Sequence, residues 1–157
     1  MKLPSLAEVP VFRAHALDPR LASRAFPLVQ LSCPNIQLRV WMDYVRAQAN
    51  GRRGTGGVTS IQDERGYIHG VFSWNLTGHL ICRKSIRISD LVLANLPGRA
   101  LLDAVLAEIQ ALAACTGAGA IMVEAGANIG GLHRGVLLAN GFRPAGEQLE
   151  MVLRVAP

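Results

Sequence analysis

Aromatic and charged residues are both scarce in this chain of 157 residues, and each shortage narrows the range of functions. Aromatic side chains make up 5% of the sequence and charged side chains 17%. The formal net charge is +5, but Lys and Arg are scattered and not clustered with stacking aromatics, as nucleic-acid-binding proteins cluster them. The composition therefore argues against nucleic acid as a partner, and it is compatible with a phosphate-bearing cofactor.

Metal-binding cysteine patterns and long apolar runs are also missing. The three cysteines, Cys33, Cys82 and Cys115, lack both the Cys-x-x-Cys spacing and the even number typical of metal sites and disulfide frameworks. No run reaches the roughly 20 apolar residues that span a bilayer, and residues 1–17 lack the apolar core of a signal peptide. We therefore expect a cytoplasmic protein with reduced cysteines, no metal and no membrane association.

The order of strand and helix patterns is the most informative feature that the sequence does have. Half of the residues are hydrophobic, which is enough for one packed domain covering residues 1–157. Period-two patterns predict strands over residues 9–17, 58–64, 67–76, 79–95 (one strand or two) and 119–126, and a strand, turn and strand over 141–155. Period-3.6 patterns and caps predict helices over residues 19–31, 36–50 after Asn35 as N-cap, 98–116 before Gly117, and 131–140.

The corner between the long strand and the third helix has two interpretations. It reads Asn95-Leu-Pro97-Gly98-Arg99-Ala100. A helix N-terminus carries free N–H groups and about half a positive charge, Gly98 admits close approach of a phosphate, and Arg99 adds a cation. The alternative is an ordinary helix start with Pro97 near the first helical position.

A second glycine-rich segment, "GRRGTGG" at residues 51–57, looks more like a phosphate loop in composition. It follows a helix and precedes a strand, however, whereas a phosphate cradle of this kind needs strand, loop and helix in that order. We therefore interpret it as a surface connection and not as the cofactor loop.

Three stretches, in order, resemble the GNAT superfamily of N-acetyltransferases, across essentially the whole chain. They are the corner and helix "LANLPGRALLDAVLAEIQALA", the strand "GAIMVEAG" and the helix end "GVLLANGF". They look like the family's acyl-CoA pyrophosphate loop with its helix, the strand beside the cofactor, and the final helix ending in Gly-Phe. The resemblance implies an α/β fold with a mixed, mostly antiparallel sheet flanked by helices, in the order β-α-α-β-β-β-α-β-α-β.

The same resemblance implies the cofactor and the residues that bind it. Acetyl-CoA is the acyl donor of the family, and its pyrophosphate would lie at the corner. Backbone N–H groups of the central strand would polarise the thioester carbonyl. The cofactor-binding residues are then Leu91, Leu93, Asn95, Gly98, Arg99 and Ala100.

Acyl transfer to an amine needs a group that accepts the ammonium proton. Asp90 shares strand parity with Ile86, Ile88 and Val92, so either it is buried among apolar neighbours or a bulge redirects it. Otherwise it caps a turn or pairs with an arginine.

Two further residues complete the catalytic candidates. Glu124 ends the buried strand, where open α/β sheets place ligands, although an exposed strand-end charge is also common there. His133 lies one helical turn before Leu137, which occupies the position of a Tyr that often acts as general acid in the family. His133 is a candidate substitute for that acid, or a structural histidine. His69 could line the acceptor pocket, and nothing in the sequence singles it out.

The sequence therefore leads to two hypotheses of different classes. The first is an N-acetyltransferase that moves an acetyl group from acetyl-CoA to an unidentified small-molecule or peptide amine. The second is a non-catalytic GNAT-like domain that binds CoA or serves as a dimerising module, since homodimers are common for this resemblance. Two departures from the family favour the second hypothesis: Leu137 in place of the usual Tyr, and a degenerate acyl-CoA loop that matches the family pattern at Gly98 and Ala100 with Asn95 in the lead position.

Overall fold

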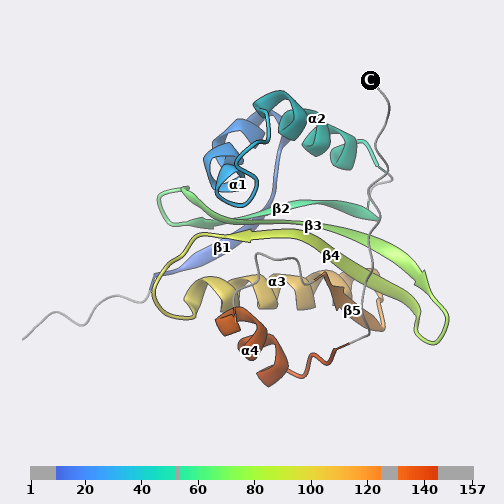
Figure 1. Cartoon of the computed structure of the whole chain (residues 1–157). Helices are drawn as coiled ribbons and strands as arrows, with labels where there is room; N and C mark the ends of the chain where they lie inside the picture. The colour runs from blue at the N-terminus through green and yellow to red at the C-terminus, as the bar shows by residue number, and fades with distance from the viewer. Residues whose placement is uncertain (1–9, 52–53, 125–130, 145–157) are drawn as a thin grey trace, which may run out of the picture.

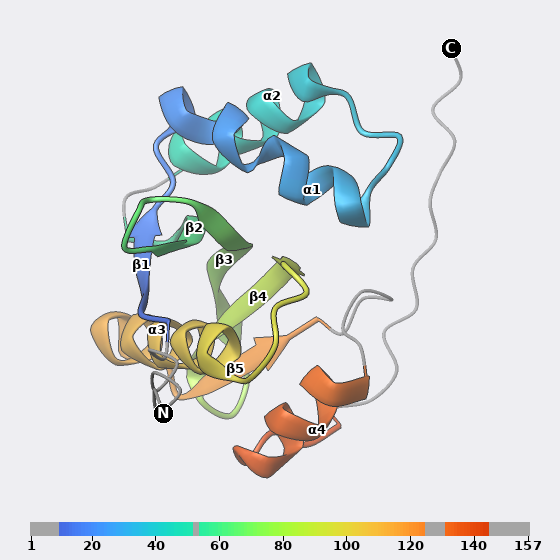
Figure 2. The same ribbon diagram turned by 90° about the vertical axis from the view of Figure 1, so that its left-hand side faces the viewer.

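The chain folds into three layers, with one sheet between two sets of helices (Figure 1). The computed structural model describes residues 10–51, 54–124 and 131–144. Its strands are β1 (Phe12–Ala16), β2 (Gly56–Asp63), β3 (Ile68–His79), β4 (Arg83–Leu93) and β5 (Ala120–Val123). Its helices are the 3-10 helix η1 (Pro19–Ala25) and the α-helices α1 (Phe26–Ser32), α2 (Leu38–Ala49), α3 (Ala100–Thr116) and α4 (Gly131–Ala139). Figure 2 shows α1 and α2 on one face of the sheet and α3 and α4 on the other.

The five strands lie in the order β1-β2-β3-β4-β5. The first four are antiparallel neighbours, and β5 pairs with β4 in parallel after the crossover through α3. This confirms the mixed, mostly antiparallel sheet flanked by helices. The order of elements agrees with the prediction as far as the last helix, and the expected final strands fall mainly on residues 145–157, outside the described residues.

A bulge interrupts β4 near its carboxyl end. Val71 pairs with Val92 and Ser73 with Ser89, so Phe72 alone lies opposite both Asp90 and Leu91. Asp90 has a φ of +50°, in the left-handed region that Asp tolerates better than most residues. The extra residue reverses the alternation of side chains along β4. Ile88, before the bulge, therefore faces the core on the α3 side, whereas Val92, an even number of residues later, faces the core on the α1–α2 side.

Two hydrophobic cores cover the two faces of the sheet. On the α3 side, Phe72, Ile86 and Ile88 are fully buried against the helix. On the other side, Val71 and Val92 pack against α1 and α2. Burial of each such side chain contributes roughly 1.5–3 kcal/mol, so both helical layers are fixed to the sheet by apolar contacts.

Helix α3 has the apolar face that the sequence predicts. Val105 and Ile109 face the sheet, Leu102 and Leu106 pack against α4, and Gly117 ends the helix with a φ of +67°. The helix begins at Ala100 and not at residue 98, because Gly98 has a φ of +84° and cannot be part of an α-helix. Proline in the first helical turn is therefore the wrong explanation for this corner.

Two helix predictions are wrong in their boundaries. The segment predicted as one helix over residues 19–31 is η1 followed by α1, because Pro27 has no N–H to continue the hydrogen-bond ladder. The N-cap of α2 is Gln37 and not Asn35. Asn35 lies in a turn that the Ile36 N–H closes by donating to the Cys33 carbonyl over 3.0 Å.

The strands predicted over residues 67–76 and 79–95 imply a turn at residues 77–78, but the turn lies further along the chain. Strand β3 continues to His79, and the Thr77 hydroxyl is 2.9 Å from that of Ser85 across the ladder. The reversal follows His79, whose Nδ1 accepts the backbone N–H groups of Ile81 and Cys82. None of the helices in residues 10–51, 54–124 and 131–144 has the length and apolar character needed to cross a membrane.

Candidate active site

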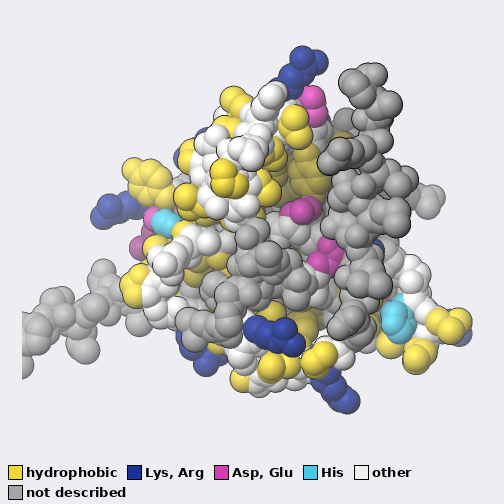
Figure 3. Space-filling view, viewed as in Figure 1, with side chains coloured by type: hydrophobic (Ala, Val, Ile, Leu, Met, Phe, Trp, Pro, Cys, Tyr) yellow, Lys and Arg dark blue, Asp and Glu magenta, His cyan; other side chains and the backbone are white. Residues whose placement is uncertain are grey.

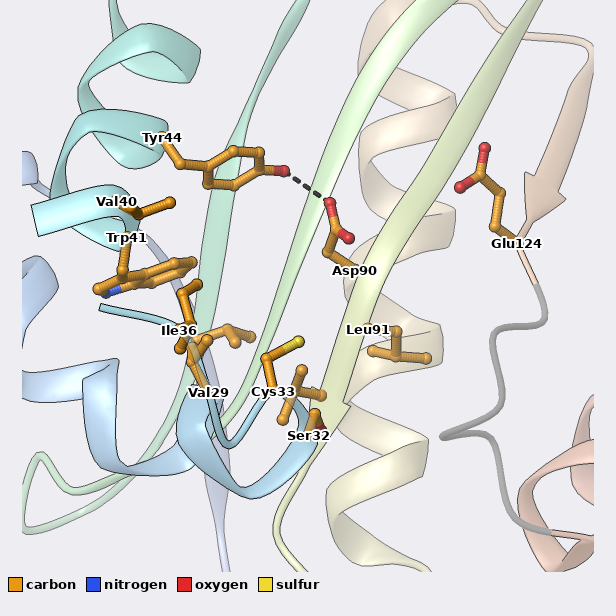
Figure 4. Close-up of a pocket in the computed structure, with 12 residues that line it drawn as sticks. Val29, Ser32, Cys33, Ile36, Val40, Trp41, Tyr44, Asp90, Leu91 and Glu124 are labelled. Atoms are coloured by element: carbon orange, nitrogen blue, oxygen red, sulfur yellow. Dashed lines mark hydrogen bonds between the residues drawn. The ribbon is translucent and has the colours of Figure 1, made fainter. Parts of the chain in front are cut away.

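A cavity of about 280 Å³ lies between the α1–α2 layer and the bulged end of β4 (Figure 4). Three segments form it: the end of α1 with the following turn, one face of α2, and the sheet at β3, β4 and the end of β5. The lining residues are Val29, Ser32, Cys33, Ile36, Val40, Trp41, Tyr44, Val71, Asp90, Leu91, Val92 and Glu124. Most of this wall is apolar, and its polar groups are few.

Asp90 reaches the cavity because of the bulge. Its side chain leaves β4 towards α2, where the Tyr44 hydroxyl donates a 2.8 Å hydrogen bond to Oδ2 (Figure 4). The Ser73 hydroxyl lies 3.3 Å from the same oxygen. Asp90 is exposed, so of the two alternatives for this residue the structure has the bulge and not burial.

Tyr44 holds its proton firmly. The Tyr44 pKa is raised to about 12, chiefly because burial disfavours the charged phenolate. The hydrogen bond with Ser73 acts in the opposite direction, and the Asp90 carboxylate adds to the rise by accepting a hydrogen bond from the protonated hydroxyl. Tyr44 is therefore a neutral phenol at pH 7 and a hydrogen-bond donor to Asp90. Its ring stacks on Trp41, whose Nε1 donates to the Ala22 carbonyl over 2.7 Å.

Glu124 enters the same cavity from the end of β5. The parallel pairing of β4 with β5 covers Ser85 to Ile88, and the Glu124 N–H donates to the Ile88 carbonyl over 2.9 Å. The described pairing of β4 with β5 ends at this contact, just before the bulge at Asp90. The Glu124 carboxylate is 3.2 Å from Nε of Arg87, which neutralises part of its charge.

The corner between β4 and α3 has the features of an anion site. The N-cap residue of α3 is Arg99, and its side chain makes no capping hydrogen bond. It therefore does not occupy the N–H groups of the first helical turn. A Cβ built on Gly98 meets nothing within 4 Å, so the backbone there is open on that side. The Arg99 guanidinium is exposed and lies 3.4 Å from Asp103 one turn along the helix. These residues fit a pyrophosphate, although Arg99 is already shared with a carboxylate.

Solved structures of acetyltransferases have the same arrangement of strands and helices. A glucosamine-6-phosphate N-acetyltransferase of Arabidopsis thaliana superposes with a TM-score of 0.71 at 14% identity, covering 92% of this chain and 99% of that one. An aminoglycoside N-acetyltransferase in complex with CoA superposes at 0.76 with 8% identity, covering 96% and 99%. The chain has the GNAT acetyltransferase fold.

The GNAT fold of this chain does not come with a close relative in sequence. No protein-family model and no curated protein matches it. A transcriptional regulator of Bacillus halodurans superposes equally well, with a TM-score of 0.75 at 11% identity and coverage of 90% and 99%. At such identities the fold is shared and the activity has to be argued from the site.

Within this GNAT fold, the predicted site residues fall into two groups. Asp90, Glu124 and Leu91 line the cavity. Leu93, Gly98 and Arg99 line a smaller crevice of about 20 Å³, which also includes Val136 of α4. Asn95 does not line this crevice, although its neighbours Ala94 and Leu96 do, and Ala100 is the first residue of α3.

The two α4 candidates have different outcomes. His133 lies on α4, and its side chain is outside the described residues. Leu137 packs against the small core of Leu102, Leu106 and Val136. His69 does not line the cavity; its Nε2 is 2.9 Å from Asp63, and this contact lowers the Asp63 pKa.

Sequence reasoning did not identify the contact between Tyr44 and Asp90. The spacing of Trp41, Met42 and Tyr44 predicts a core face first, on a helix that often borders the acceptor site in proteins of this resemblance, and Trp41 is indeed buried at 5% exposure. The available signal was chemical, because a tyrosine on an apolar helix face carries a hydroxyl that needs a partner. No group of three or more His, Cys, Asp or Glu residues in the described part of the chain is placed to hold a metal ion.

Proposed function

We propose that the protein is an acyl-CoA-dependent N-acyltransferase that transfers an acetyl group from acetyl-CoA to an amine. The observation that carries the proposal is the Asp90 carboxylate, which the β4 bulge turns into a largely apolar cavity beside the end of the β4–β5 pairing. The shared fold with N-acetyltransferases, one of them solved with CoA, supports the reaction class.

Asp90 is suited to accept a proton from the acceptor. An amine arrives as an ammonium ion and has no lone pair until it loses one proton, which passes to the Asp90 carboxylate directly or through water. Both hydrogen bonds from Tyr44 and Ser73 go to Oδ2, so they would fix the carboxylate and leave Oδ1 to take the proton of the acceptor. Tyr44, with its pKa raised to about 12, does not compete for that proton.

The bond changes then balance without a further reactant. The nitrogen attacks the thioester carbonyl carbon, the C–N bond forms and the C–S bond breaks. The second nitrogen proton leaves as the amide forms and passes through water to the departing thiolate, while the protonated Asp90 returns its proton to solvent. Thiols have a pKa of about 8.5, so the thiolate leaves without a dedicated acid. Leu137 in place of the family tyrosine therefore slows turnover without preventing it.

The residues at the β4–α3 corner would hold the acyl donor. Gly98 and the uncapped N-terminus of α3 offer backbone N–H groups to a pyrophosphate, with Arg99 as a nearby cation. The N–H groups of Leu91 and Leu93, on the part of β4 beyond its pairing with β5, are the donors for the thioester carbonyl.

Asp90→Asn tests the proposal, with Asp43→Asn as a matched control. Asp43 lies on the exposed face of α2, where it pairs with Arg39 and Arg46, and it is remote from the cavity lining. Both variants lose one carboxylate. Free-thiol release from acetyl-CoA should fall about a hundredfold in Asp90→Asn, the usual effect of losing a general base, and stay unchanged in Asp43→Asn. Equal activity of the two variants at pH 7 would contradict the role of Asp90.

One observation favours a second function, that of a CoA-binding domain without turnover. Leu137 is packed into a hydrophobic cluster, so no acid side chain stands at the family's usual position. Under this alternative, acetyl-CoA and CoA raise the melting temperature, while no amine in a broad panel releases thiol above the rate of hydrolysis between pH 7 and 9.

A further inference from the structure

The charges around the cavity are opposite to those of the protein as a whole. The chain has 16 Lys and Arg residues against 11 Asp and Glu residues. Yet the described residues that line the cavity include two carboxylates, Asp90 and Glu124, and no Lys, Arg or His. Arg87 is paired with Glu124, which leaves Asp90 as the uncompensated charge. A ligand carboxylate or phosphate would face like charge here, whereas an ammonium would not.

The rest of the wall offers few hydrogen bonds. The face of α2 presents Val40 and Trp41, and the turn before it presents Ile36, all opposite Asp90 (Figure 4). Figure 3, a view of one face of the whole molecule, shows acidic side chains near the middle, directly below a group of hydrophobic side chains. An acceptor rich in hydroxyl groups would lose its bonds to water without finding partners on this wall.

We propose that the acceptor is a primary amine on an uncharged apolar body, such as an arylalkylamine. Its ammonium lies at Asp90, and its body lies against the apolar wall of Ile36, Val40 and Trp41. The inference rests on the proposed function, since it takes this cavity as the acceptor site. It excludes amino acids, sugar phosphates and polyhydroxylated amines as preferred acceptors.

Cys33 provides a test of binding that needs no acyl donor. It is a free, exposed thiol that lines the cavity, and Cys115 is a free, exposed thiol on α3 that does not. The full chain is treated with iodoacetamide, and the alkylation rate of each cysteine is followed by peptide mass spectrometry. At ten times its dissociation constant, phenethylamine occupies all but about a tenth of the sites, so alkylation of Cys33 should slow about tenfold while that of Cys115 stays unchanged.

Matched ligands separate the charge from the apolar body. 2-Phenylethanol has the same body without the ammonium, phenylalanine adds a carboxylate, and glucosamine 6-phosphate is a hydroxylated, anionic amine. Each should protect Cys33 at least about tenfold less well than phenethylamine, because it either lacks the ammonium that pairs with Asp90 or adds an anion that Asp90 repels. A tenfold difference in the dissociation constant corresponds to about 1.4 kcal/mol. Equal protection by any of the three would overturn the proposal.

Matched variants locate the two contacts. Asp90→Asn should weaken phenethylamine about tenfold and leave 2-phenylethanol unaffected. Val40→Ser should weaken both ligands, whereas Leu38→Ser should weaken neither, because Leu38 is also an exposed apolar residue of α2 but does not line the cavity. If Asp90→Asn still binds phenethylamine with full affinity, the proposed position of the ammonium is wrong. This result does not depend on whether the substitution changes the stability of the protein.

The outcome distinguishes this inference from the proposed function. Protection of Cys33 with no N-acetylphenethylamine formed on adding acetyl-CoA supports the acceptor class and contradicts the transferase. Rapid acetylation of an amino acid or an aminosugar, with Cys33 left unprotected by phenethylamine, supports the transferase and overturns the acceptor class.

Discussion

Tyr44→Phe removes one hydroxyl from the cavity and should lower kcat/KM about fivefold. A hydrogen bond to a charged group is worth roughly 1.5–3 kcal/mol, and the Tyr44 hydroxyl donates to Asp90 over 2.8 Å. Asp90 is exposed and keeps its contact with Ser73 at 3.3 Å, so we expect a loss below this range, about 1 kcal/mol, which corresponds to about fivefold in rate. The ring still stacks on Trp41, so the melting temperature should change little.

The assay is free-thiol release from acetyl-CoA with the best amine of the panel, and Tyr67→Phe is the control. Tyr67 is 63% exposed in the β2–β3 hairpin and does not line the cavity. It is the only other tyrosine in the chain. Identical kcat/KM in the two variants would refute the argument that Tyr44 positions Asp90, as would complete inactivation of Tyr44→Phe without loss of stability.

Three other experiments test the fold, the cofactor corner and the environment of Tyr44. Leu106→Asp should cost about 3–5 kcal/mol of unfolding free energy by urea titration, because it forces a charge into the α3–α4 contact, whereas Ala107→Asp on the exposed face should cost less than about 0.5 kcal/mol. Gly98→Ala should abolish the rise in melting temperature on adding acetyl-CoA and Gly117→Ala should preserve it, although both place a side chain at positive φ and strain the chain similarly. In Tyr67→Phe, ultraviolet titration should show the remaining tyrosine ionising near pH 12 and not near the ordinary 10.0, and the stability gained from its folded environment should decline as the pH rises from 10 towards 12.

Local patterns were sufficient to predict most of the framework. The spacing of Leu102, Val105 and Ile109 predicts α3 and its buried face, because a single helix carries that information within a few turns. Asp90 among apolar residues of one parity left two main alternatives, a buried carboxylate in a regular strand or a bulge that redirects it. The bulge at that residue supplies the reason for the pattern.

The residues that line the cavity could not be predicted from the sequence, because they come from helices and strands that are far apart in the chain and meet only in the folded structure. Tyr44 and Asp90 are 46 positions apart, and only the packing of α2 over β4 brings them together. The turn at residues 77–78 was misplaced for a similar reason, since the Thr77–Ser85 contact extends the hairpin past a local turn signal. The start of α3 depends on the positive φ of Gly98. Glycine adopts positive and negative φ about equally readily, so the sequence does not determine whether the helix includes this residue.

The most direct test of the account is product analysis with acetyl-CoA labelled in its acetyl carbon and phenethylamine as acceptor. Mass spectrometry should find N-acetylphenethylamine carrying the label, in amounts equal to the free CoA released, with little of either product in Asp90→Asn. Release of free CoA together with labelled acetate but no acetylated amine would contradict an amine acyltransferase that uses Asp90 as its base. Equal yields from the wild type and Asp90→Asn would contradict it too.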